Sequence, residues 1–162
     1  MRSIITGVAA VFGVLSILAF LTACRNGEDN SQYILAFGEV AHTVNQSGYD
    51  LADSFLLLSS CVTDEQCAEA TDGLVRELER YIPVIETQIQ KLEQLEPLDD
   101  WQGLQSTYLE QLRLRVDGGK MIIDGWESAD EALVAQGFER FQESQAKLGE
   151  ILDELKVALE DQ

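Results

Sequence analysis

The sequence is poor in histidine, cysteine, proline and positive charge. It has one histidine, three cysteines and two prolines, and 11 Lys+Arg stand against 29 Asp+Glu, a formal net charge of −18. A single histidine argues against metal centres built from several imidazoles and against nucleophiles that need a histidine base. The shortage of cations argues against nucleic-acid binding and against a domain lying flat on an anionic membrane.

The start of the chain has the order of a bacterial export signal. Arg2 supplies positive charge, residues 4–20 form an uncharged apolar run, and small residues lead into Cys24. This order is typical of a targeting segment that is removed from the mature protein. The motif Leu21-Thr22-Ala23-Cys24 resembles the lipobox of bacterial lipoproteins. The resemblance implies cleavage before Cys24 and acylation of that cysteine by fatty chains such as palmitate, and it carries no catalytic residue or cofactor.

The same segment predicts where the protein works. Arg2 stays on the cytoplasmic side by the positive-inside tendency, so the rest of the chain faces the extracytoplasmic side. We expect a lipid-anchored protein of the cell membrane or outer membrane. The alternative is an uncleaved anchor, because residues 4–23 are long enough to span a bilayer of ~30 Å. Both interpretations place the domain on the same side.

Cys61 and Cys67 are left once Cys24 is assigned to lipid. An even remainder in an exported chain predicts one structural disulfide. Between these cysteines, Thr63-Asp64-Glu65-Gln66 is a capping box that predicts a helix with Thr63 as its N-cap. The bridge would fix how the chain enters that helix, and a loop this short stabilises the fold by ~2 kcal/mol.

From residue 31 onward, apolar side chains recur at three- and four-residue steps in four successive stripes. The cysteine turn, Pro97 and a second capping box, Ser128-Ala129-Asp130-Glu131, separate the stripes. Pro83 lies in phase within the second stripe and predicts a kink. The fold class predicted is all-α, an antiparallel up-down-up-down four-helix bundle after an N-terminal apolar signal helix.

The expected organisation has three parts: a signal peptide at residues 1–23, an acylated cysteine with a short polar tether at 24–30, and the bundle at 31–162. The tether spans only ~20 Å when extended, so the domain would lie close to the membrane. The segment Leu95-Glu96-Pro97-Leu98-Asp99-Asp100-Trp101 is similar to an element of exported bacterial lipoproteins, a Leu-x-Pro break followed by amphipathic helices. This similarity, over residues 85–160, implies a helical bundle and no site residues.

Few residues are placed for chemistry. Glu39 and His42 have the Glu-x-x-His spacing of di-iron bundles, but those sites need the motif twice, so we predict no metal and an exposed His42. A second set is formed by the arginines at positions 76, 80, 113 and 115. They are candidates for gripping an anion, but pairing with surface glutamates such as Glu77, Glu79 and Glu110 is the preferred interpretation.

The bundle topology predicts a candidate binding surface at the membrane-distal end. Antiparallel order brings the turns at 59–63 and 127–128 together, with the acidic residues Asp124 and Glu127 beside Trp126. Gly48, Gly73, Gly119 and Gly137 all fall about nine or ten residues below those turns, at a common depth of ~14 Å. Because glycine inside a helix costs up to ~1 kcal/mol, this layer predicts close packing, with a small pocket as the alternative.

The sequence therefore predicts a membrane-anchored extracytoplasmic lipoprotein that acts as a non-catalytic helical interaction module for a protein or envelope partner. The alternative is a small-molecule or metal-ion binding or sensing lipoprotein that uses the membrane-distal end of the bundle. We expect no enzyme, because no poised acid, base or nucleophile stands out from the surface charge. We also expect no cofactor and no nucleic-acid partner.

Overall fold

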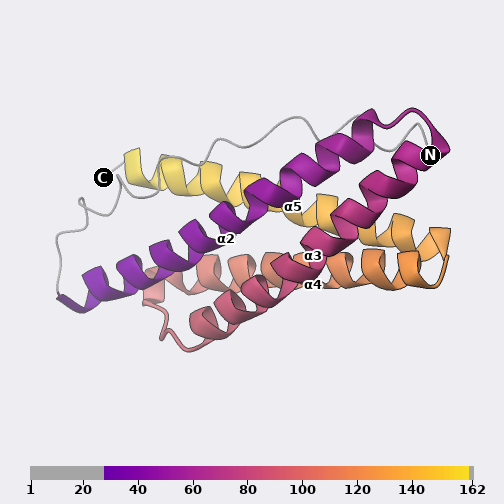
Figure 1. Cartoon of the computed structure of the whole chain (residues 1–162). Helices are drawn as coiled ribbons and strands as arrows, with labels where there is room; N and C mark the ends of the chain where they lie inside the picture. Colours follow the sequence, from indigo (N-terminus) through magenta and orange to yellow (C-terminus); the bar gives the residue numbers. More distant parts are fainter. Residues whose placement is uncertain (1–27, 161–162) are drawn as a thin grey trace.

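The computed structural model describes residues 28–160, which form four long α-helices joined by short turns (Figure 1). These are α2 (Glu28–Ser60), α3 (Asp64–Glu93), α4 (Gln102–Glu127) and α5 (Glu131–Glu160), and a short 3-10 helix, η1 (Asp99–Trp101), leads into α4. No strand occurs among these residues. The prediction of an all-α helical bundle is confirmed, whereas the signal segment and Cys24 lie outside the described residues.

Each helix reverses the direction of the one before it (Figure 1). At one end, Phe37 of α2 contacts the rings of Trp101 and Tyr108, near the start of α4. At the other end, Phe55 of α2 contacts Phe138, near the start of α5. The turns at 61–63 and 128–130 therefore share one end of the bundle, which we call the far end. The start of α2 and the α3–α4 connection form the near end.

Helix α3 supplies the centre of the core. Leu74, Leu78, Ile85 and Leu92 are fully buried on one of its faces, and α3 continues through Pro83 without a break. Fully burying such side chains stabilises a fold by ~1.5–3 kcal/mol each. The closest helix pair is α4 with α5, followed by α2 with α3 and α3 with α4. Among the described residues, α2 and α5 have almost no close backbone approach and meet through aromatic rings.

The start of α3 is as predicted. The Thr63 hydroxyl accepts a hydrogen bond from the Gln66 N–H at 3.2 Å, and Gln66 Oε1 accepts one from the Thr63 N–H at 3.4 Å. The predicted disulfide joins Cys61 to Cys67, whose Cα atoms lie 5.1 Å apart. Local sequence signals thus suffice to define the α2–α3 turn.

The predicted capping box at Ser128 is wrong. The Ser128 hydroxyl instead donates to the Asp124 carbonyl at 2.6 Å and closes α4. Ala129 has a φ of 55°, in the left-handed region, so the chain reverses there and resumes helical geometry only at Glu131. Asp130 is the N-cap in place of Ser128, because its Oδ1 accepts from the Ala132 and Leu133 N–H groups, each at 3.0 Å.

Helix α2 begins earlier than predicted, at Glu28, so residues 28–30 are helical and not part of a tether. Two acidic residues in this first turn favour a helix N-terminus because they oppose the positive end of the helix dipole. Within residues 28–160, no helix is both long and apolar enough to cross a membrane.

Candidate functional site

The far end carries most of the large apolar side chains that are exposed among the described residues. Leu56, Leu57 and Val62 are 50%, 63% and 75% exposed, and Trp126 is 37% exposed. The one other large apolar side chain exposed in this part of the chain is Leu35, in the near-end half of α2. Single exposed apolar residues are ordinary on a soluble protein, but a group of them marks a contact surface.

The leucines are exposed because α2 is covered on only one side. Leu51, Ser54 and Phe55 face the core, so the adjoining positions Leu56 and Leu57 point away from it, given the 3.6-residue period of a helix. On the outer side of these last turns, Leu56 and Leu57 are accompanied by the exposed polar residues Asp53, Ser59 and Ser60. A neighbour covers only the inner side here. We define Leu56, Leu57 and Val62 as the far-end apolar patch.

The disulfide and the capping box fix the backbone beneath this patch. The bridge closes the turn that carries Val62, and Thr63 and Gln66 satisfy the first N–H groups of α3. Asp64 and Glu65 in the first turn of α3 oppose the helix dipole. The patch therefore lies on the last turns of α2 and on a connecting turn whose backbone is already fixed before any partner binds.

Trp126 ties the second far-end turn to α3. Its indole N–H donates to Asp72 Oδ1 at 2.8 Å, and the ring is partly exposed. Asp124 and Glu127, the other predicted surface residues, are exposed on the same helix end. The three residues proposed from the sequence thus lie together at the far end, with Trp126 serving partly as a structural link.

The predicted glycine layer is only half present. A Cβ on Gly137 would lie 2.7 Å from the Gly118 carbonyl oxygen, and one on Gly119 would lie 3.1 Å from Ile82 Cδ1, so both glycines allow close packing. Around Gly48 nothing lies within 4 Å of such an atom, and beside Gly73 only an arginine nitrogen does, at 3.9 Å. The four-glycine layer is therefore wrong, because the glycines of α2 and α3 do not face a neighbouring backbone.

The sequence analysis missed Gly118 and Gly125. A Cβ on Gly125 would lie 2.7 Å from the Val134 backbone nitrogen, and one on Gly118 would lie 2.8 Å from the Gly137 carbonyl oxygen. Their seven-residue spacing puts both on one face of α4, the face packed against α5. That spacing is the signal by which they are recognisable.

The four candidate arginines do not converge. Arg80 Nη1 pairs with Glu77 Oε1 at 2.7 Å and Arg113 Nη2 with Glu93 Oε1 at 2.6 Å, both at the surface, and Arg76 is exposed. Surface pairing is thus confirmed for Arg80 with Glu77. Arg113 also pairs at the surface, but with Glu93 of α3, which is not among the glutamates named from the sequence. Because the four arginines lie apart from one another, they do not form a common anion-binding site.

The prediction of a surface position for Arg115 is wrong, because this residue is buried. Its Nε donates to Ser144 Oγ at 3.2 Å, its Nη1 to the Tyr81 hydroxyl at 3.1 Å, and its Nη2 to Gln145 Oε1. The guanidinium carbon lies 5.4 Å from the centre of the Phe141 ring. Neutral oxygens and an aromatic face thus hold this cation where α3, α4 and α5 meet, a use of arginine that suits its planar fork.

A second polar network closes the near end. The Tyr33 hydroxyl donates to Gln105 Oε1 at 2.7 Å, and Gln105 Nε2 donates to the Leu92 and Leu95 carbonyls at 2.8 and 3.1 Å. The Leu92 carbonyl belongs to the last turn of α3 and the Leu95 carbonyl to the residues that follow it, so Gln105 caps the chain where α3 ends. Burial raises the pKa of Tyr33 to about 12, so the phenol stays neutral.

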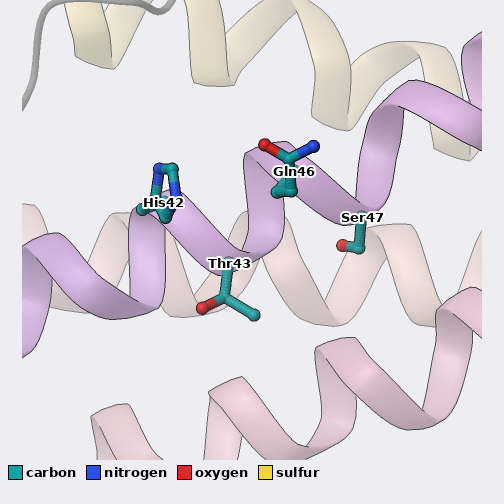
Figure 2. A pocket seen from close by; sticks show the side chains of 4 residues that line it. All are labelled: His42, Thr43, Gln46 and Ser47. Atoms are coloured by element: carbon teal, nitrogen blue, oxygen red, sulfur yellow. The ribbon is translucent and has the colours of Figure 1, made fainter.

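A shallow hollow of about 370 Å³ lies on the outer side of α2, lined by His42, Thr43, Gln46 and Ser47 (Figure 2). His42 is exposed, as the sequence predicts. The Thr43 and Ser47 hydroxyls donate to the Glu39 and Val44 carbonyls of their own helix, each at 2.9 Å. All four lining residues come from α2, and no group of three His, Cys, Asp or Glu residues with metal-binding geometry occurs among the described residues.

The geometry defines a class of protein: an acidic all-α helical bundle with a disulfide and an apolar patch at one end. No known protein family, curated protein or solved structure significantly matches the chain. We therefore infer the function from the residues of this chain alone.

Proposed function

We propose that this protein is a membrane-anchored extracytoplasmic lipoprotein that acts as a non-catalytic interaction module for a protein or envelope partner. The motif ending in Cys24 supports the anchor, and the far-end apolar patch supports the docking role. The patch carries the proposal, because exposed apolar side chains at the end of α2 and on the turn that follows are costly to leave in water and favourable to cover. A bundle anchored at its near end would hold this patch away from the membrane.

Lipid labelling tests the anchor. In the bacterium that makes the protein, an alkyne analogue of palmitate should label the wild-type chain and fail to label the Cys24→Ser variant. Protease added outside cells whose outer barrier has been opened should digest the domain. An unlabelled wild-type chain, or a domain protected from external protease, would contradict this part of the proposal.

Site-specific photo-crosslinking tests the docking role. A photoreactive amino acid at position 57 should give a discrete cross-linked product in cells, because Leu57 is 63% exposed within the patch. The matched control is position 35, since Leu35 is on the same helix and 51% exposed, but away from the far end. A product at position 35 and none at position 57 would exclude docking through the far end.

No structural observation favours the alternative role in small-molecule or metal-ion binding. Neighbouring backbone or the Ile82 side chain fills the space beside the closely packed glycines. The hollow beside His42 is open and lined by one helix. Ligand sites are usually concave and lined from several elements. We therefore assign the far end to protein contact.

A further inference from the structure

Among the described residues, no basic side chain lies at the far end of the bundle. No lysine or arginine lies between Arg25 and Arg76, and none lies between Lys120 and Arg140. These two stretches contain both far-end turns and the helix ends beside them. The basic residues of the described chain are thus confined to the middle and near-end parts of the bundle.

Exposed acidic residues share the far end with the apolar patch. Those that are exposed at this end are Asp53, Asp64, Glu65, Glu69, Asp72, Asp124, Glu127, Asp130 and Glu131. Every ion pair found among the described residues lies elsewhere, on Glu77, Glu86, Glu93 or Glu143. The far-end carboxylates are therefore not neutralised by basic side chains of the described chain, and an apolar centre with a polar border is the usual anatomy of a protein interface.

We propose that the far end binds a cationic amphipathic segment of a partner protein. Apolar side chains of that segment would cover Leu56, Leu57 and Val62, and its lysines and arginines would lie over the far-end carboxylates. This inference rests on the proposed docking function and adds the chemistry of the partner. It follows from charge complementarity, because juxtaposed like charges disfavour the wrong partner and opposite charges favour the right one.

The same charges select against two other occupants. A second copy of this chain would bring two anionic ends together, which like-charge repulsion opposes. A membrane rich in anionic lipids would repel the patch, because juxtamembrane attraction requires basic residues. The ordered α2–α3 turn favours binding in a further way, since a surface fixed by a disulfide loses little conformational freedom when a partner arrives.

Two designed peptides test this chemistry on the full chain in neutral detergent. They share one apolar helical face, and their polar positions are all lysine in one and all glutamate in the other. Fluorescence anisotropy should show binding of the lysine peptide and none of the glutamate peptide, with affinity falling as salt increases. Leu57→Ser and Val62→Ser should each weaken binding about tenfold, a typical loss for an interface anchor.

Matched variants separate the far end from general attraction to an acidic protein. Leu35→Ser should leave affinity unchanged, because Leu35 is similarly exposed at the other end of α2. The double change Glu65→Gln and Glu69→Gln should weaken binding and reduce its salt dependence, whereas Glu110→Gln, at an exposed site on α4, should do neither. Circular dichroism of each variant confirms that the fold is retained.

Three results would overturn the inference. The first is equal binding of both peptides, and the second is an equal loss of affinity in Leu35→Ser and Leu57→Ser. The third is a cellular cross-link from position 57 to a partner segment without lysine or arginine. This last result would leave the docking function intact, whereas the absence of any far-end cross-link would remove the docking function itself.

Discussion

The α4–α5 interface and the α2–α3 turn are held together in opposite ways. Along α4 and α5, glycines bring the two backbones together, and Arg115 is buried between three helices. In the α2–α3 turn, one disulfide and one capping box hold the backbone while Leu57 and Val62 face outward. Order at the interface depends on packing, whereas order in the turn depends on local bonds. Only the second arrangement leaves its apolar side chains free to contact a partner.

Gly137→Ala should break the α4–α5 interface and have the largest effect. Alanine favours a helix by up to ~1 kcal/mol over glycine, but its Cβ would lie 2.7 Å from the Gly118 carbonyl oxygen. We expect a net loss of ~3 kcal/mol in the free energy of unfolding, at the upper end of overpacking costs. Chemical denaturation of the two proteins, wild type and variant, measures it.

Gly73→Ala is the matched control, because a Cβ there meets only an arginine nitrogen at 3.9 Å. The same substitution should raise stability by up to ~1 kcal/mol through helix propensity alone. Equal effects of the two substitutions would mean that α4 and α5 are not in close backbone contact.

Arg115→Ala should lower the free energy of unfolding by about 2–3 kcal/mol, because it removes a buried stem and leaves Tyr81 and Ser144 without their donor. Arg115→Met should cost less, since methionine fills similar volume without the desolvation of a charge. Arg113→Ala is the control: Arg113 is paired with Glu93 at the surface and should change stability by under about 1 kcal/mol. Thermal and urea unfolding of the three variants check this order.

The contrast between Arg113 and Arg115 shows a feature that was not predicted from the sequence, the burial of a single arginine. Both are basic residues of one amphipathic helix, but they lie on nearly opposite sides of it, and the neutral partners that hold Arg115 in the interior come from α3 and α5. Gly137 poses the same problem, since its role depends on Gly118 of another helix. Features encoded within a few residues were predicted well, including the Thr63 cap and the disulfide.

The Ser128 error shows that local motifs also depend on backbone conformation. Ser128 and Asp130 are both acceptable N-cap residues, and the left-handed φ of Ala129 selects Asp130. The residue type does not predict this left-handed conformation, because alanine rarely adopts it. The far-end apolar patch was missed for another reason: periodicity identifies the buried side of α2 but does not show that its remaining leucines lack a neighbour.

Replacing both Cys61 and Cys67 by serine should weaken the turn without loosening the bundle. The loop-entropy relation predicts a loss of ~2 kcal/mol for so short a loop. Hydrogen exchange should increase most at the start of α3, where local opening is no longer restrained, and at the α4–α5 interface only by as much as the loss of global stability allows. An increase in α4 and α5 as large as that at the start of α3 would contradict this local effect.

Leu57→Ser should give the smallest change in stability, within about 0.5 kcal/mol, because surface substitutions away from special features rarely exceed this. Leu57 is 63% exposed, so serine there removes little buried area. The same substitution is expected to weaken partner binding about tenfold, as for other interface anchors. A residue that matters for binding and hardly at all for folding is what distinguishes a docking surface from a core. A stability loss of several kcal/mol would place Leu57 in the core and remove it from the proposed surface.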